Sequence, residues 1–115
     1  MRYTVYQIQI DRTVYDRVNE LGHEGAAQQY PEYAARMATS FLGSKQYRPE
    51  YSQYYAPVCE IQADDLNGVF HIGNMGPEES ITRLAAMHSV SVGDIIEDEQ
   101  GCRVMVDSYG FGEIQ

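Results

Sequence analysis

Apolar and polar residues alternate along the first ten positions of the chain. An extended backbone would divide the segment RYTVYQIQI into two sides, with Tyr6, Ile8 and Ile10 on one and Val5, Gln7 and Gln9 on the other. A period of two is typical of a half-buried β-strand, so we expect a strand close to the N-terminus.

The pattern then changes to helical spacing. Val14, Val18 and Leu21 recur at intervals of three and four, Thr13 is a candidate N-cap, and Gly22 is placed to end the helix. HEGAAQQ has the composition of a connection. Pro31 is placed as the first residue of a second helix that ends at Gly43 and carries one apolar stripe, formed by Ala34, Met37, Ala38 and Phe41.

The middle of the chain mixes turn signals with short periodic segments. KQYRPEYSQYYAP contains two prolines and predicts a loop, and VCEIQA alternates as a strand. Residues 64–74 predict a short helix capped by Asp64 or Asp65. Residues 76–88 predict another that starts at Pro77, stops near His88 and faces inward through Ile81, Leu84 and Ala85.

Alternation returns near the C-terminus. Val90 and Val92 alternate with serines, Gly93-Asp94 predicts a turn, and the loop EDEQG separates Ile95-Ile96 from the alternating Cys102, Val104 and Val106. The whole pattern predicts one α+β domain over residues 1–115: a mainly antiparallel sheet of about four strands, with three to four short helices packed on one face. The strand order stays open.

The C-terminal segment MHSVSVGDIIEDEQGCRVMVDSYGFGEI resembles the signature of the YodL-like family, in which His-Ser-x-Ser-Val precedes Asp-x-Ile and a Val-Asp-Ser-x-Gly-Phe ending. YTVYQI and YAPVCEIQADDLNGVFHIGN are similar to upstream parts of that family, whereas residues 12–50 match none of it, and Gly93 departs from the more usual serine. The resemblance implies a small protein of bacterial mobile elements or prophages with no assigned activity. The signature, at 88–111, falls on His88, Ser89, Ser91, Val92, Asp94, Val106, Asp107, Ser108, Gly110 and Phe111.

Charge is unevenly distributed along the chain. The net charge is −9, and the residues from Glu60 onward contain eleven acids against only Arg83 and Arg103. This acidity argues against direct nucleic-acid binding, which depends on clustered Lys and Arg. It is compatible with a soluble surface or with a basic protein partner, such as a factor of the host cell. The absence of a secretory or membrane-spanning pattern, with Cys59 and Cys102 widely spaced, predicts a cytoplasmic protein with reduced thiols.

Catalytic and metal-binding patterns are weak. His88, Ser89 and Asp107 supply the residue types of a hydrolase triad, but His88 and Ser89 are neighbours, and neighbouring strand residues point to opposite faces. No nucleophile elbow surrounds Ser89 or the other candidate, Ser108. His23, His71 and His88 are scattered singly, so we expect no metal and no cofactor. The structural interpretation is that Ser89, Asp94 and Asp107 hold turns and caps.

Two segments are candidates for contact with a partner. One is the tyrosine-rich loop, because tyrosine is favoured at interfaces, although the same rings could cover the sheet. The other is the acidic hairpin. The candidate interaction residues are Tyr47, Tyr51, Tyr54, Tyr55, Glu97, Asp98 and Glu99.

The functional expectation is a non-catalytic interaction domain. Two alternatives stay open: an acidic mimic of DNA that inhibits a host nuclease or DNA-binding protein, and a small enzyme that uses His88 and Asp107, with Asp94 nearby. The oligomeric state also stays open, a homodimer included.

Overall fold

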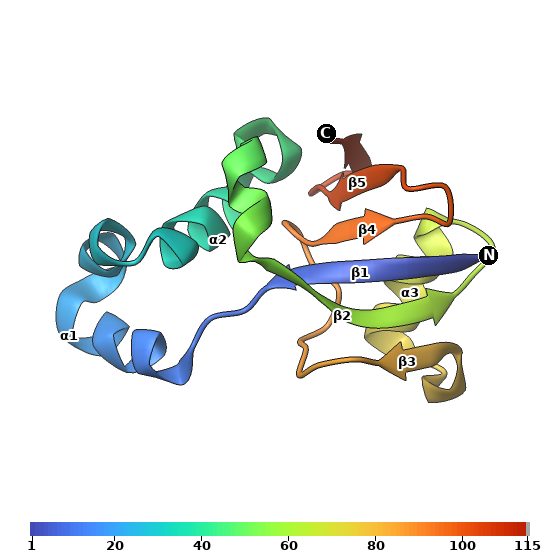
Figure 1. Ribbon diagram of the computed structural model, residues 1–115, viewed down its shortest axis with the longest axis horizontal. Helices are drawn as coiled ribbons and strands as arrows, with labels where there is room; N and C mark the ends of the chain where they lie inside the picture. Colours follow the sequence, from blue (N-terminus) through green and yellow to red (C-terminus); the bar gives the residue numbers. More distant parts are fainter. Residues whose placement is uncertain (115) are drawn as a thin grey trace.

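The computed structural model describes residues 1–114 and contains a six-stranded antiparallel sheet with the order β3-β2-β1-β4-β5-β6 (Figure 1). The strands are β1 (Arg2–Ile8), β2 (Tyr55–Gln62), β3 (Ile81–Arg83), β4 (Ile95–Glu97), β5 (Arg103–Val106) and β6 (Phe111–Glu113). The α-helices are α1 (Arg12–Gln29), α2 (Pro31–Leu42) and α3 (Leu66–Met75). Three short 3-10 helices are η1 (Gly43–Gln46), η2 (Pro49–Tyr54) and η3 (Glu78–Ser80).

The α+β class and the antiparallel sheet confirm the expectation from the sequence, but six strands replace the predicted four. The additional strands, β3 and β6, form the two edges of the sheet and contain three residues each. Three residues are too few to establish a period of two, so these strands become recognisable only through their pairing with β2 and β5.

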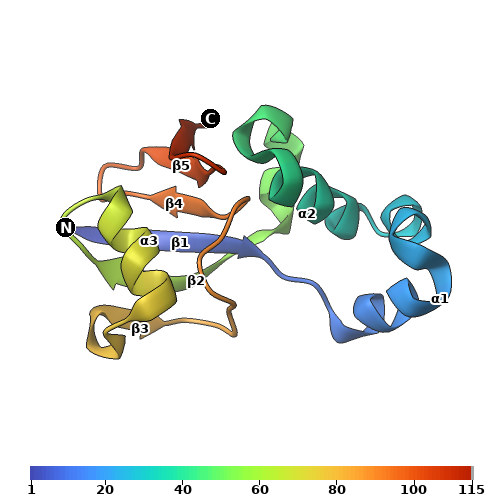
Figure 2. The same cartoon turned by 180° about the vertical axis from the view of Figure 1, so that it is seen from behind.

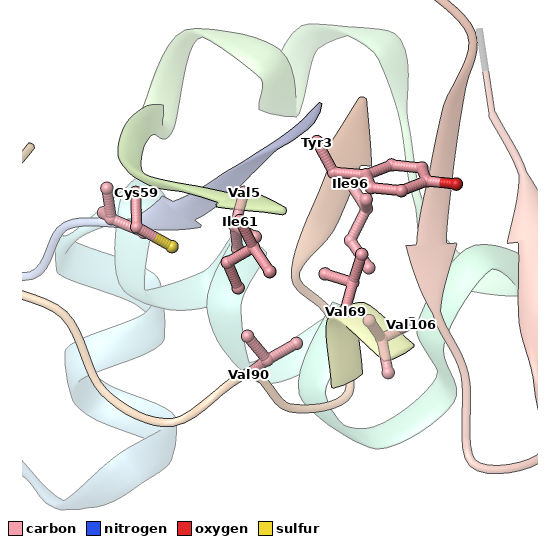
Figure 3. Packing of buried hydrophobic residues seen from close by; sticks show 9 residues of the cluster. Tyr3, Val5, Cys59, Ile61, Val69, Val90, Ile96 and Val106 are labelled. Atoms are coloured by element: carbon pink, nitrogen blue, oxygen red, sulfur yellow. The ribbon is translucent and has the colours of Figure 1, made fainter. Parts of the chain in front are cut away.

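The main core lies between one face of the sheet and α3. Tyr3 and Val5 of β1, Ile61 of β2 and Ile96 of β4 pack with Val69 of α3, as Figure 3 shows. The Asp65 side chain caps α3 by accepting a hydrogen bond from the Gly68 amide at 2.8 Å, which confirms one of the two predicted caps.

The face of β1 that lies against this core contains Tyr3, Val5 and Gln7, so the polar Gln7 points inward.

Helices α1 and α2 form an arm that extends from one end of the sheet (Figure 2). The arm has its own small apolar cluster around Val14, Ala26 and Tyr33. At Gly22, φ is 73°, a left-handed value that an L side chain rarely adopts, and the helix kinks there. The expected helix end at Gly22 is thus a kink, and HEGAAQQ is helical because it packs Ala26 against Tyr33. The arm changes the predicted layout, since α3 alone covers the main face of the sheet.

Two predictions about the helices of the arm are wrong. Asp11, not Thr13, caps α1 with its side chain. On α2 the buried residues are Tyr33, Ala35 and Thr39, and Phe41 is exposed; of the expected stripe, Met37 packs against the small cluster of the arm.

The predicted helix over residues 76–88 does not form. In its place, η3 is followed by β3, in which Ile81 and Thr82 pair with Ile61 and Glu60 of β2. The open edge of β2 supplies hydrogen-bond partners that outweigh the helical pattern, and Leu84 remains exposed. Across residues 1–114, no helix is both long and apolar enough to span a bilayer.

Candidate functional site

Gln7 organises a buried polar junction at the end of the sheet nearest the arm. Its side chain is 1% exposed. The Gln7 Nε2 donates to the His88 carbonyl oxygen at 3.0 Å and to Asp94 Oδ2 at 2.9 Å, and Gln7 Oε1 accepts from the His88 amide at 3.3 Å. One side chain of β1 therefore connects the segment before the C-terminal hairpin to the turn that starts it.

The protons of Gln7 also determine the role of the His88 ring. The side-chain amide nitrogen of Gln7 carries two protons, and it donates them to the His88 carbonyl oxygen and to Asp94 Oδ2. No proton is left for His88 Nδ1, so the 3.2 Å distance from Gln7 Nε2 to His88 Nδ1 is a close approach and not a hydrogen bond. Nδ1 is then free to donate to the Ser89 carbonyl oxygen at 2.7 Å. The exposed imidazole is held by its own loop, not by a carboxylate.

Asp94 closes the turn that precedes β4. Its Oδ2 accepts from the Ser91 amide at 2.9 Å as well as from Gln7, and the residue is 5% exposed. Burial raises the pKa of the Asp94 carboxyl to about 6, against the opposing effects of the Ser91 hydrogen bond and the His88 charge. Ser91 contributes its backbone amide here.

The cavity beside Asp94 is small. It has a volume of about 20 Å³ and is lined in part by Arg36, Thr39, His88 and Ser91. A space of this size accommodates about one water molecule, so it cannot admit a substrate.

Asp107 forms a second polar contact, with η1. Its Oδ1 accepts from the Ser44 amide and its Oδ2 from the Ser44 hydroxyl, both at 2.7 Å. The Asp107 amide donates to the Gly110 carbonyl oxygen at 3.0 Å, which closes the turn containing Ser108 and leads into Phe111, itself packed against the main core. Both oxygens of Asp107 are therefore engaged in structure, and no hydrogen bond joins Asp107 to His88 among the described residues.

The acids of the hairpin are bound within the protein. Glu97 pairs with Arg103 at 2.8 Å and accepts from the Tyr6 hydroxyl at 3.1 Å. Asp98 Oδ1 accepts from the amides of Gln100 and Cys102, and Glu99 accepts from the Arg2 amide. The hairpin does not present a row of free carboxylates.

The four candidate tyrosines are half-buried beside the sheet. The Tyr47 ring meets the rings of Tyr51 and Tyr55 edge to face at 6.3 and 6.4 Å. The Tyr55 hydroxyl donates to the Gly93 carbonyl oxygen, and Tyr54 lines a separate groove. Packing is thus a role of Tyr47, Tyr51 and Tyr55, and their role in an interface stays a prediction.

A more exposed apolar surface lies where α2 ends. Phe41 is 77% exposed, Leu42 55% and Tyr109 97%, and all three line one hollow of about 300 Å³ together with Lys45, Asp107 and Ser108. We call this surface the Phe41 patch. Its members come from segments more than 60 positions apart, so only the folded chain brings them together.

The three histidines have different surroundings. His23 stacks on Tyr33, with Nδ1 at 2.6 Å from the Tyr33 hydroxyl, whereas His71 is an exposed residue of α3. Over residues 1–114, no three His, Cys, Asp or Glu side chains gather closely enough to hold a metal ion.

Comparisons with protein-family models, with curated proteins and with solved structures found no match to this chain. The resemblance to the YodL-like family therefore stays a prediction, and the function has to be inferred from the contacts described above.

Sequence reasoning did not identify Gln7, Ser44 or the Phe41 patch. The alternation places Gln7 on the same side of the strand as Val5 but does not indicate that this side is buried. Ser44 contacts Asp107, which lies 63 positions further along the chain. The available signal was weak: an amide inside an otherwise apolar strand face is a candidate for a buried hydrogen-bond network.

Proposed function

We propose that this chain is a non-catalytic protein-interaction domain of a bacterial mobile element or prophage, and that it binds its partner through the Phe41 patch. The observation that carries the proposal is the convergence of Phe41, Leu42 and Tyr109 around one hollow. Large apolar side chains that gather on a surface are unfavourable in water unless a partner covers them. Aromatic residues of this kind supply most of the binding energy in protein interfaces.

The buried polar groups support this proposal over an enzyme. Ser44 binds both carboxylate oxygens of Asp107, Gln7 and Ser91 both bind Oδ2 of Asp94, and the cavity beside Asp94 is about 20 Å³. The acidic hairpin likewise gives little support to a mimic of DNA, because Glu97, Asp98 and Glu99 each bind groups of this same chain.

Selection from a displayed library of random peptides tests the proposal without knowledge of the partner. Peptides that bind the wild-type protein should lose at least about tenfold in affinity toward a Phe41→Ser/Tyr109→Ser variant, since two exposed aromatic anchors of about 1 kcal/mol or more each are removed. The affinity is measured by fluorescence anisotropy of each labelled peptide.

Met75→Ser is the matched control, because Met75 is as exposed as Phe41, at 77%, but lies at the end of α3. The control variant should bind the selected peptides as the wild type does. Selected peptides that bind both variants equally well would place the interaction surface elsewhere and refute the role of the patch.

A further inference from the structure

We propose a second binding site: a groove between the arm and η2 that takes an arginine side chain of a partner protein. Four segments line the groove, which has a volume of about 440 Å³. They are the connection from β1 to α1, the start of α1, the junction of α1 with α2, and η2. Figure 1 shows this connection running below α2 on its way from β1 to α1. The lining residues used below are Gln9, Asp11, Tyr30, Glu32, Gln53 and Tyr54.

The two glutamines of the groove present acceptors. Gln9 Nε2 donates to the Ala86 carbonyl oxygen at 3.0 Å, and Gln53 Nε2 donates to the Glu50 carbonyl oxygen at 2.9 Å. Because a carbonyl oxygen can only accept, each amide is fixed with its nitrogen on the protein, and its Oε1 is left for another donor. Two of the residues that line the groove therefore each have a neutral acceptor available.

Two carboxylates add negative charge at the same place. Asp11 Oδ1 accepts from the amide and hydroxyl of Thr13, which lowers the pKa of Asp11 and keeps it ionised. Its second oxygen takes part in neither contact. Glu32 lies in the first turn of α2 and forms no ion pair with the described residues, and no Lys or Arg is among the described residues that line the groove.

The tyrosines make arginine the best match among cationic side chains. Tyr30 and Tyr54 are both among the residues that line the groove. A planar guanidinium stacks on aromatic faces while its five N–H groups reach several acceptors at once. A lysine ammonium is compact and strongly hydrated, so it uses this dispersed set of acceptors less well. The combination of acceptors, charge and rings points to a cation, not to an anion or an apolar segment.

This site goes beyond the proposed function, because it does not involve the Phe41 patch. Glu32 and Phe41 are nine positions apart on α2, which corresponds to opposite sides of a helix with about 3.6 residues per turn. The net charge of −9 further favours a basic partner through long-range attraction.

The test is a titration of the intact protein with the blocked tripeptide Gly-Arg-Gly, followed by two-dimensional ¹H–¹⁵N NMR. The side-chain amide signals of Gln9 and Gln53 should shift and saturate, and the tripeptide with citrulline in place of arginine, which has similar shape but no charge, should leave them unmoved. Gly-Lys-Gly should bind more weakly than Gly-Arg-Gly; equal binding would refute the assignment to arginine.

Single substitutions locate the site, with two variants that lose the same charge as a matched pair. Glu32→Gln should weaken the binding of Gly-Arg-Gly about fivefold, and Tyr54→Leu about threefold, whereas Glu24→Gln, an exposed acid of α1 outside the groove, should leave it unchanged. Equal losses in Glu32→Gln and Glu24→Gln, or shifts without saturation, would overturn the proposal. Such a failure would leave the peptide-library result for the Phe41 patch untouched, so the two proposals stand or fall separately.

Discussion

At the scale of single residues, Asp94 places a carboxylate where little water reaches it. Burial raises its pKa to about 6, so the folded state binds this proton more tightly than the unfolded state, in which an aspartate has a pKa near 3.9. An acid with a raised folded-state pKa lowers the free energy of unfolding as the pH rises from about 4 through about 6, and the loss is complete only about one pH unit above the folded-state pKa.

We therefore expect Asp94→Asn to gain stability relative to the wild type over that pH range. Asparagine removes the charge and keeps an acceptor for the Ser91 amide. The difference in unfolding free energy should grow by roughly 2 kcal/mol between pH 4 and pH 6.5, since a tenfold change in proton affinity is worth about 1.4 kcal/mol and titration is incomplete at both ends of this range. Urea denaturation at several pH values measures it.

Asp64→Asn is the control for loss of one charge, because Asp64 is exposed. The Asp64 variant should not show this growth between pH 4 and pH 6.5. A difference for Asp94→Asn that stays constant, or that reverses in sign, would show that the ionised Asp94 is not destabilising.

Residue identity alone predicted part of this site. Asp94 and Asp107 were expected to hold turns, and each does accept backbone amide hydrogens. The partners Gln7 and Ser44 could not be predicted, because they lie 87 and 63 positions away and the pairing depends on strand order. Local pattern determines which side chains suit a turn, whereas the long-range contacts come from the assembled sheet.

At the scale of elements, α2 approaches the sheet closely at one glycine. A Cβ atom on Gly93 would lie 3.1 Å from the backbone and the hydroxyl of Thr39, and φ at Gly93 is +95°. Gly110 has a similar φ of +81°, but a Cβ there would meet nothing within 4 Å. The two positions share the backbone requirement and differ in packing.

Gly93→Ala should therefore destabilise the protein more than Gly110→Ala. Backbone strain applies to both and is worth about 1–2 kcal/mol, and the contact with Thr39 adds about 1 kcal/mol or more at Gly93. Thermal denaturation of both variants against the wild type measures the difference. Equal losses would mean that α2 moves away from the sheet without penalty.

Elements with a clear period were the predictable ones. The alternation in β1 and β2 and the loop between β4 and β5 were enough to locate these strands, and Pro31 marked the start of α2. The segment from 77 to 88 misled because its local signals favour a helix, yet Thr82 and Ile81 complete an open edge of the sheet. Edge pairing is a non-local interaction, and no local pattern reports it.

At the scale of the whole molecule, two apolar clusters divide the chain into parts of unequal stability. The sheet and α3 share a core of nine buried residues, whereas the arm has three, Val14, Ala26 and Tyr33. The molecule is elongated, at 43 × 26 × 22 Å, with the arm at one end (Figure 1). Because fewer apolar contacts hold the arm, it should open at lower free energy than the sheet.

Native-state hydrogen exchange tests this division. Amides of α1 and α2 should exchange with an opening free energy below that of β1, β2 and β4, and Val14→Ala should lower the values of the arm and the sheet together by roughly 2 kcal/mol, because both the opening of the arm and global unfolding expose Val14. Val5→Ala, in the main core, should instead lower the values of the sheet and leave those of the arm nearly unchanged, because the opening of the arm leaves the main core folded. Equal protection of the arm and the sheet in the wild type would contradict the division and would make the arginine groove, which lies between the arm and η2, a rigid site.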